Sequence, residues 1–197
     1  MLFRSISGYI KKSSYKSTEV VSFFNKPFYH LEGKSYREIR ETKNKYNKTI
    51  IIKKDIEDIQ EVVNFILNWN EERGKEKYGW FLHSGYDINF FERHWKEEKD
   101  NLWSSFFYIE DRLVGYSICS KERVNDCYNY IIRKNDISLR NLTLYIDYKT
   151  FERIWKETEE QEFYINWGCS SKTLLRYKKK FPVYSLKTKY FLKFTKE

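Results

Sequence analysis

The sequence is poor in residues that interrupt regular structure, with only 7 glycines and 2 prolines among 197 residues. This scarcity favours long helices and strands with few tight turns. No apolar run approaches the roughly 20 residues that a transmembrane helix requires. Residues 1–12 also lack the apolar core of a signal peptide. We therefore expect a soluble, cytoplasmic protein, and contact with an anionic membrane surface stays open.

Residues that bind metals or form disulfides are few and scattered. The three cysteines are Cys119, Cys127 and Cys169, and the three histidines are His30, His83 and His94. Their spacing matches neither a disulfide framework nor a CxxC zinc site, so we expect reduced thiols and no bound metal. Walker, HExxH, GxSxG and GxGxxG motifs are absent too. Their absence argues against P-loop nucleotide hydrolysis, zinc proteolysis and serine esterase chemistry.

Aromatic and basic residues are abundant. Aromatic side chains make up 19% of the chain, with 17 tyrosines and 15 phenylalanines, which is typical of a folded core and not of a disordered chain. The formal net charge is +9. A basic chain favours a phosphate-bearing partner such as RNA, a cofactor or an anionic membrane. An AT-rich coding sequence would give the same lysine excess, so both explanations stay open.

Apolar periodicity and turn residues predict an alternation of strands and helices. The predicted strands are residues 49–54, the two arms of a hairpin over 103–122, and residues 127–134, 163–167 and 184–194. The predicted helices are residues 55–69, 89–99, 139–159 and 173–180. Asp55 is the expected N-cap of the first helix, Leu67 lies on its apolar face, and Pro182 follows the last helix. The apolar run at residues 20–24 is expected to pair at a sheet edge.

This order predicts an α/β (α+β) fold with a mixed, largely antiparallel sheet. Residues 49–197 would form the main domain, and residues 1–48 an N-terminal extension that packs a basic helix on it. In that helix, i, i+3 spacing aligns four basic side chains: Lys34, Arg37, Arg40 and Lys43. The stripe is either a solvated surface or a contact for phosphate groups.

The order of elements resembles the GNAT acyltransferase fold, whose twisted sheet has helices on both faces. Residues 55–69 look like its first helix, and FFYIEDRLVGYSIC, residues 106–119, looks like its central hairpin. LEGKSYREIRETKNKY, residues 31–46, is similar to a segment of the phosphatidylglycerol lysyltransferase C-terminal domain family. The strand end Lys134-Asn135-Asp136, the strand Tyr164-Ile165-Asn166 and the helix Leu175-Arg176-Tyr177-Lys178 also resemble that family. The resemblance covers roughly residues 28–190.

The resemblance implies transfer of an acyl or aminoacyl group to an amine or hydroxyl without a covalent enzyme intermediate. The donor would be acetyl-CoA, another acyl-CoA or an aminoacyl-tRNA, and the acceptor a small molecule, a peptide or a lipid. The alternative is a non-catalytic GNAT-like module that binds RNA or a protein partner.

Three residues are candidates for catalysis. By position, the resemblance makes Tyr177 the proton donor for the leaving group, although its helical face also suits a core aromatic. Asn166 would bind the donor or the attacking amine, or else tie down the turn that follows it. Asp136 is a candidate base, or else a solvated surface carboxylate.

A second group is expected to hold the phosphates of the donor. The glycine-rich pyrophosphate loop of GNAT enzymes is absent, and KNDISLRNLTLY, residues 134–145, stands in its place. The free N–H groups and the dipole of the helix that begins here still suit an anion. The residues expected to contact the cofactor are Lys134, Ser138, Arg140, Asn141 and, on the helix near the C-terminus, Lys178.

Overall fold

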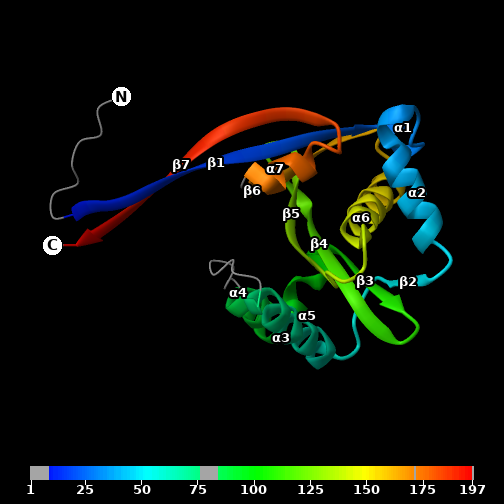
Figure 1. Ribbon diagram of the computed structural model, residues 1–197, viewed down its shortest axis with the longest axis horizontal. Helices are drawn as coiled ribbons and strands as arrows, with labels where there is room; N and C mark the ends of the chain where they lie inside the picture. Colours follow the sequence, from blue (N-terminus) through cyan, green and yellow to red (C-terminus); the bar gives the residue numbers. More distant parts are fainter. Residues whose placement is uncertain (1–8, 76–83, 171, 197) are drawn as a thin grey trace.

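The computed structural model describes residues 9–75, 84–170 and 172–196, whose strands form a seven-stranded sheet in the order β2-β3-β4-β5-β6-β1-β7 (Figure 1). Every neighbouring pair is antiparallel except β5 and β6, which are parallel. The strands are β1 Tyr9–Asn25, β2 Ile50–Lys53, β3 Leu102–Ile109, β4 Arg112–Val124, β5 Cys127–Asn135, β6 Glu162–Ser170 and β7 Val183–Lys196.

Helices cover both faces of the sheet. The α-helices are α1 Lys26–Tyr29, α2 Arg37–Tyr46, α3 Ile59–Lys75, α4 Ser84–Asn89, α5 Trp95–Glu98, α6 Leu142–Thr158 and α7 Lys172–Lys178. Short 3-10 and π turns at Lys34–Tyr36, Phe90–His94 and Lys99–Asn101 extend some of them. Figure 1 shows α3, α4 and α5 on one side of β3 and β4, with α6 and α2 on the other. No helix of the described part is long and apolar enough to cross a membrane.

The side-chain alternation of the central hairpin explains the two helical layers. Phe106 and Tyr116 are opposite each other and pack in one core cluster with residues of α3. Phe107 and Val114 belong to another cluster with Ile146 of α6. Because successive strand residues point to opposite faces, both faces of this hairpin are apolar and each needs a covering layer.

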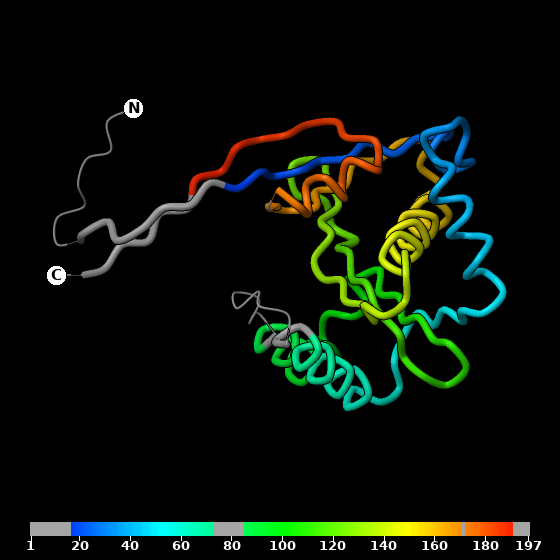
Figure 2. The backbone as a smooth tube through the Cα atoms, in the orientation of Figure 1, coloured from blue at the N-terminus to red at the C-terminus, as the bar shows by residue number. Residues whose placement is uncertain are grey.

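The predicted fold class is confirmed, and several details differ from the predictions. The segment at residues 20–24 is not at an edge, because β1 lies between β6 and β7, as the tube in Figure 2 also shows. The first long helix begins at Ile59, and Asp58 caps it by accepting the Gln60 N–H at 2.8 Å, whereas Asp55 accepts the N–H of its neighbour. Leu67, expected in the core, is 47% exposed.

The helix expected over residues 89–99 is divided between α4, a π turn, α5 and a 3-10 turn. Phe91 and Trp95 are both buried against the sheet. A π turn shifts the register of the helix by part of a turn, so this placement of two large rings depends on the sheet and has no local sequence signal. Residues 1–8 and His83, which entered the predictions, lie outside the described residues.

The approach of α6 to β4 depends on a glycine. A Cβ atom at Gly115 would lie 2.6 Å from Cδ1 of Ile146 and 2.9 Å from the carbonyl oxygen of Lys134. We predict that Gly115→Ala lowers the free energy of unfolding by about 1–3 kcal/mol, because the packed core cannot accept the added methyl group. Chemical denaturation measures the change. Gly85→Ala is the control, since a Cβ there meets nothing within 4 Å, and equal losses in both variants would contradict the prediction.

Candidate functional site

The sheet opens where its two parallel strands separate. β5 and β6 pair only from Cys127 and Tyr164 to Asn129 and Asn166. Beyond these residues β5 continues along β4, while β6 continues along β1. The backbone N–H and C=O groups at the point of separation are therefore released from this pairing, and side chains from α6 and α7 reach the gap.

A buried carboxylate occupies this gap. Asp147 of α6 is fully buried and accepts hydrogen bonds from the hydroxyls of Tyr130 and Tyr177, each at 2.6 Å. It also forms an ion pair with Arg133, whose side chain is 19% exposed. Tyr130 and Arg133 come from β5 and Tyr177 from α7, so three elements meet at one charge. We call these four residues the splay network.

Burial and mutual contact shift the pKa values within the splay network. Burial raises the pKa of Asp147 above its ordinary value, against the opposing effect of Arg133. Burial opposes the charge of Arg133, yet Asp147 beside it raises the pKa of that guanidinium. Burial and then Asp147 raise the pKa of Tyr177 well above its usual range. Tyr177 is therefore a neutral phenol at pH 7 that can donate a proton in a hydrogen bond.

Lys178 lies beside the network as a second ionisable group. Its side chain is buried, and Nζ donates to the carbonyl oxygen of Trp167 at 2.6 Å. Burial, and then the positive charge of Arg133, lower the pKa of Lys178 to about 8. A lysine with this pKa has an appreciable neutral fraction near neutral pH and can act as a base.

Asn166 lies on the other face of the sheet. Trp167 next to it packs in the core cluster with Phe151 of α6, so alternation turns Asn166 away from the splay network. Its Oδ1 accepts the Gly168 N–H at 2.8 Å, and its Nδ2 donates to Glu19 at 3.4 Å. Gly168 has φ +66°, so Asn166 closes a turn at a bulge of β6.

The connection from β5 to α6 holds an internal anion. Asp136 accepts the N–H and the hydroxyl of Ser138, at 2.9 and 2.6 Å, and pairs with Arg112 at 2.9 Å. Burial opposes its ionisation, but the hydrogen bonds from Ser138 and the ion pair with Arg112 lower the pKa of Asp136. Asp136 is therefore a weak proton acceptor. It also occupies the N–H and the hydroxyl of Ser138, which the sequence analysis expected to bind the phosphates of the cofactor.

The other residues expected at this connection are dispersed. Lys134 is buried and pairs with Asp87 of α4 at 2.6 Å, with its ammonium 4.3 Å from the ring centre of Trp69. Arg140 is exposed, and Asn141 precedes α6 with φ +63° and no side-chain hydrogen bond to the helix. These side chains do not converge on one point with Ser138.

The basic stripe of α2 and the turn before it contributes mainly to internal contacts. Arg40 donates to the carbonyl oxygens of Leu31 and Gly33, and Lys43 donates to the Tyr148 hydroxyl at 2.9 Å. Arg37 is exposed and pairs with Glu41 at 2.7 Å. Lys34 lies in the 3-10 turn before α2 and is exposed.

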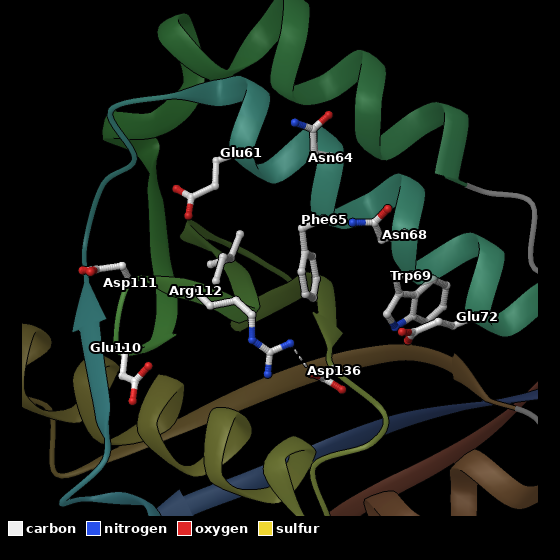
Figure 3. A pocket seen from close by; sticks show the side chains of 11 residues that line it. Glu61, Asn64, Phe65, Asn68, Trp69, Glu72, Glu110, Asp111, Arg112 and Asp136 are labelled. Atoms are coloured by element: carbon white, nitrogen blue, oxygen red, sulfur yellow. Dashed lines mark hydrogen bonds and ion pairs between the residues drawn. The ribbon is translucent and has the colours of Figure 1, made fainter.

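A cavity of about 620 Å³ lies on the α3 side of the sheet, beside Asp136 (Figure 3). Side chains of α3 form one wall, and the β3–β4 turn and the end of β5 form the other. The lining residues are Glu61, Asn64, Phe65, Asn68, Trp69, Glu72, Glu110, Asp111, Arg112, Leu113 and Asp136. In the part of the chain that the structure describes, no three His, Cys, Asp or Glu side chains are close enough to hold a metal ion.

Sequence reasoning brought Tyr177 and Lys178 to the gap but missed Asp147, Arg133 and Tyr130. A signal for Asp147 did exist, because it stands among the buried side chains of a long amphipathic helix, where a charge requires a partner. The partners on β5 carried no such signal, because Tyr130 and Arg133 are three residues apart, a spacing that regular alternation places on opposite faces. The irregular β4–β5 register between Ile118 and Cys119 lets both side chains reach Asp147.

Comparison with known proteins finds solved structures that share this fold. No known protein family and no curated protein matches the sequence. A conserved protein of unknown function from Bacteroides thetaiotaomicron VPI-5482 has a TM-score of 0.69 at 16% identity, with 95% of this chain and 63% of that chain covered. A functionally unknown conserved protein from Staphylococcus epidermidis ATCC 12228 has a TM-score of 0.56 at 10% identity, with coverage of 92% and 63%.

L-PGS from Bacillus licheniformis also shares the fold, with a TM-score of 0.56 and 12% identity over 93% of this chain and 60% of that chain. These identities establish similarity of fold alone. The structural resemblance predicted from the motifs is confirmed at this level. The chain spans less than two thirds of the length of each of these three proteins.

The ion pair at the centre of the splay network provides a test of its energetics. We predict that Asp147→Leu lowers the free energy of unfolding by about 3–5 kcal/mol, because it leaves the Arg133 charge without a partner. The double variant Asp147→Leu/Arg133→Met removes both charges and should recover most of that loss. Denaturant titration measures both, and a double variant no more stable than the single one would contradict the prediction.

Lys178 should make stability depend on pH. Its pKa is about 8 in the folded state and 10.5 ordinarily, so between these values the unfolded chain binds more protons. The free energy of unfolding should therefore rise from pH 8 to pH 10, by less than about 3 kcal/mol, and the penalty for burying the charge is fully present below pH 8. Lys178→Met should flatten this rise, while Lys179→Met, at an exposed position, should keep it. If Lys178→Met keeps the rise in the free energy of unfolding, other titrating groups cause that rise and the prediction is wrong.

Proposed function

We propose that this chain is a GNAT-like acyltransferase that uses the gap between β5 and β6 as its reaction centre. The observation that carries the proposal is the separation of these parallel strands beyond Asn129 and Asn166, with a hydrogen-bonded tyrosine and a lysine of lowered pKa beside it. The similarity of fold to L-PGS and the motif resemblance to phosphatidylglycerol lysyltransferases support the same reaction class.

In the proposed reaction an amine or hydroxyl of the acceptor attacks the carbonyl carbon of the donor. The bond from that carbon to the leaving oxygen or sulfur breaks, and a new amide or ester bond forms. Neutral Lys178 takes the proton that the attacking atom loses, and Tyr177 gives its proton to the leaving atom. Asp147 holds the Tyr177 hydroxyl at 2.6 Å and so positions it for this step.

An aminoacyl-tRNA suits the chain better than acetyl-CoA or another acyl-CoA. At the start of α6, Asp136 already uses the Ser138 donors, and the loop has no glycine that would let its backbone approach a pyrophosphate. Five of the eleven residues that line the adjoining cavity carry carboxylates, which repel phosphate groups. A tRNA can deliver its ester from outside while its phosphates interact with a chain of net charge +9. The acceptor would be an amine or hydroxyl of a small molecule, peptide or lipid.

A non-catalytic module that binds RNA or a protein is the second candidate. The observation in its favour is that the side chains in the gap satisfy one another's hydrogen bonds. An acyl group would have to displace some of these contacts before it could enter. Turnover with a charged tRNA distinguishes the two candidates.

The first test compares donors. We expect charged tRNA to lose its amino acid, faster than in buffer, when a mixed pool of amine acceptors and the protein are present. Acetyl-CoA should release no thiol under the same conditions. Thermal shift with uncharged tRNA and with CoA accompanies the assay, because a ligand at 100 times its Kd stabilises the folded state by about 2.7 kcal/mol. Binding of tRNA without deacylation would favour the non-catalytic module, and thiol release would favour the CoA donor.

The second test removes one hydroxyl. Tyr177→Phe should lower kcat by about 10²–10⁴-fold, the usual contribution of a positioned proton donor, and should leave tRNA binding unchanged. Tyr184→Phe is the matched control, since Tyr184 lies on β7, is 65% exposed and lies outside the splay network. Equal activity of Tyr177→Phe and the control would remove Tyr177 from the mechanism.

A further inference from the structure

β1 and β7 continue beyond the rest of the sheet as a two-stranded ribbon. β6 pairs with β1 only from Thr18 to Asn25, whereas β7 pairs with β1 from Tyr9 onward. Figure 1 shows this part of the two strands projecting from the other elements. We call Tyr9–Ser17 of β1, together with its partner Lys189–Lys196 of β7, the ribbon arm. At roughly 3.4 Å per residue, the arm is about 30 Å long.

The positive charge of the chain is concentrated in the ribbon arm. Its two strands read YIKKSSYKS and KYFLKFTK, and they contain six lysines and no aspartate or glutamate. The arm therefore contributes +6 of the net charge of +9, although it makes up less than a tenth of the chain. The rest of the protein is close to neutral for its size. A polyanion is therefore attracted to this one projection and not to the whole surface.

The base of the ribbon arm lies beside the gap between β5 and β6. Glu19 of β1 accepts a hydrogen bond from the Asn166 side chain at 3.4 Å and pairs with Lys189 at 3.2 Å. Asn166 is the last residue of β6 that pairs with β5. Val21 lies opposite Asn166 and is four residues beyond Ser17, so about 14 Å of strand separate the arm from the gap. A ligand that lies along the arm can thus extend into the gap.

A tRNA has the charge and the shape that this arrangement requires. Its double-stranded stem carries dense rows of phosphates, and its unpaired 3′ end carries the ester. Two strands about 4.8 Å apart are narrow enough to lie along the wide, shallow minor groove of an A-form stem, which phosphates border. An anionic bilayer also offers negative charge, but it has no free strand that could carry an acyl group into the gap.

We propose that the ribbon arm binds the acceptor stem of a tRNA and directs its unpaired 3′ end to the gap. That the RNA is a tRNA rests on the proposed function, whereas the place where it lies follows from the charge and position of the arm. The lysines of the arm replace counterions of the stem phosphates, so the affinity falls steeply as salt rises. The ester reaches the gap past Asn166, from the face turned away from the splay network.

Fluorescence anisotropy of labelled, uncharged tRNA with the full chain at about 100 mM NaCl tests the proposal. The variant Lys16→Gln/Lys189→Gln/Lys193→Gln should lower the affinity at least about tenfold and should reduce the slope of log K against log salt by about 2–3, since each lost phosphate contact accounts for about 0.7–0.9. The variant Lys16→Arg/Lys189→Arg/Lys193→Arg keeps the charge and should bind like the wild type.

The matched control for these substitutions is Lys26→Gln/Lys48→Gln/Lys96→Gln. It removes three exposed lysines that lie outside the ribbon arm, and its affinity for tRNA should stay within about threefold of the wild type. Equal losses of affinity in the two glutamine variants would overturn the proposal, because binding would then depend on net charge alone. A wild-type chain that binds no tRNA would overturn it as well. So would tighter binding to phosphatidylglycerol vesicles than to tRNA, since the arm would then be a membrane contact.

Turnover separates this proposal from the proposed reaction. Binding of tRNA that depends on the arm, without loss of its amino acid, would support the arm and contradict the reaction. Deacylation by a glutamine variant of the arm that keeps full affinity for tRNA would support the reaction and contradict the arm. Loss of affinity and of deacylation at low tRNA concentration, with kcat recovered at saturating tRNA, is the result expected if both proposals hold.

Discussion

Burying the charge of Asp147 on α6 requires donors from two other elements, β5 and α7, to meet it at one place. A carboxylate without partners in a protein interior costs several kcal/mol, and the contacts of Tyr130, Arg133 and Tyr177 with Asp147 offset that cost. These contacts tie α6 and α7 to β5 at the point where β5 leaves β6. The same network therefore fixes the opening of the sheet and supplies its polar groups. Structure and proposed chemistry depend on one interaction.

The distribution of positive charge follows from strand alternation. Arg133 and Lys134 are neighbours, so they point to opposite faces of β5 and each meets a carboxylate there, Asp147 on one face and Asp87 on the other. The charge of Lys134, which the sequence analysis expected to bind a phosphate, is thus neutralised inside the protein. What stays open on the α3 side is negative, although the whole chain is strongly basic.

Much of the fold follows from local pattern. The hairpin over residues 103–122 and the strand after it were predictable because alternating apolar residues flank clear turns, and α6 because its apolar residues recur at helical spacing. The interior place of β1 was not predictable, since its partners β6 and β7 lie more than 130 residues away along the chain. The π turn before Trp95 was also not predictable from local pattern. It places the rings of Phe91 and Trp95 against strands that are distant in sequence.

Of the candidate site, the sequence by itself determined that Tyr177 and Lys178 lie on a short helix after the strand that borders the gap. It also determined that the loop before α6 lacks the glycines that a pyrophosphate needs. Only the tertiary structure decided that Asp147 and Arg133 join Tyr177, that Asn166 points to the other face, and that Asp136 binds Ser138 and Arg112. Local periodicity specifies which face a side chain takes on its own element. Which charges meet is decided by the packing of elements far apart in sequence, where the cost of burying an ion selects its partners.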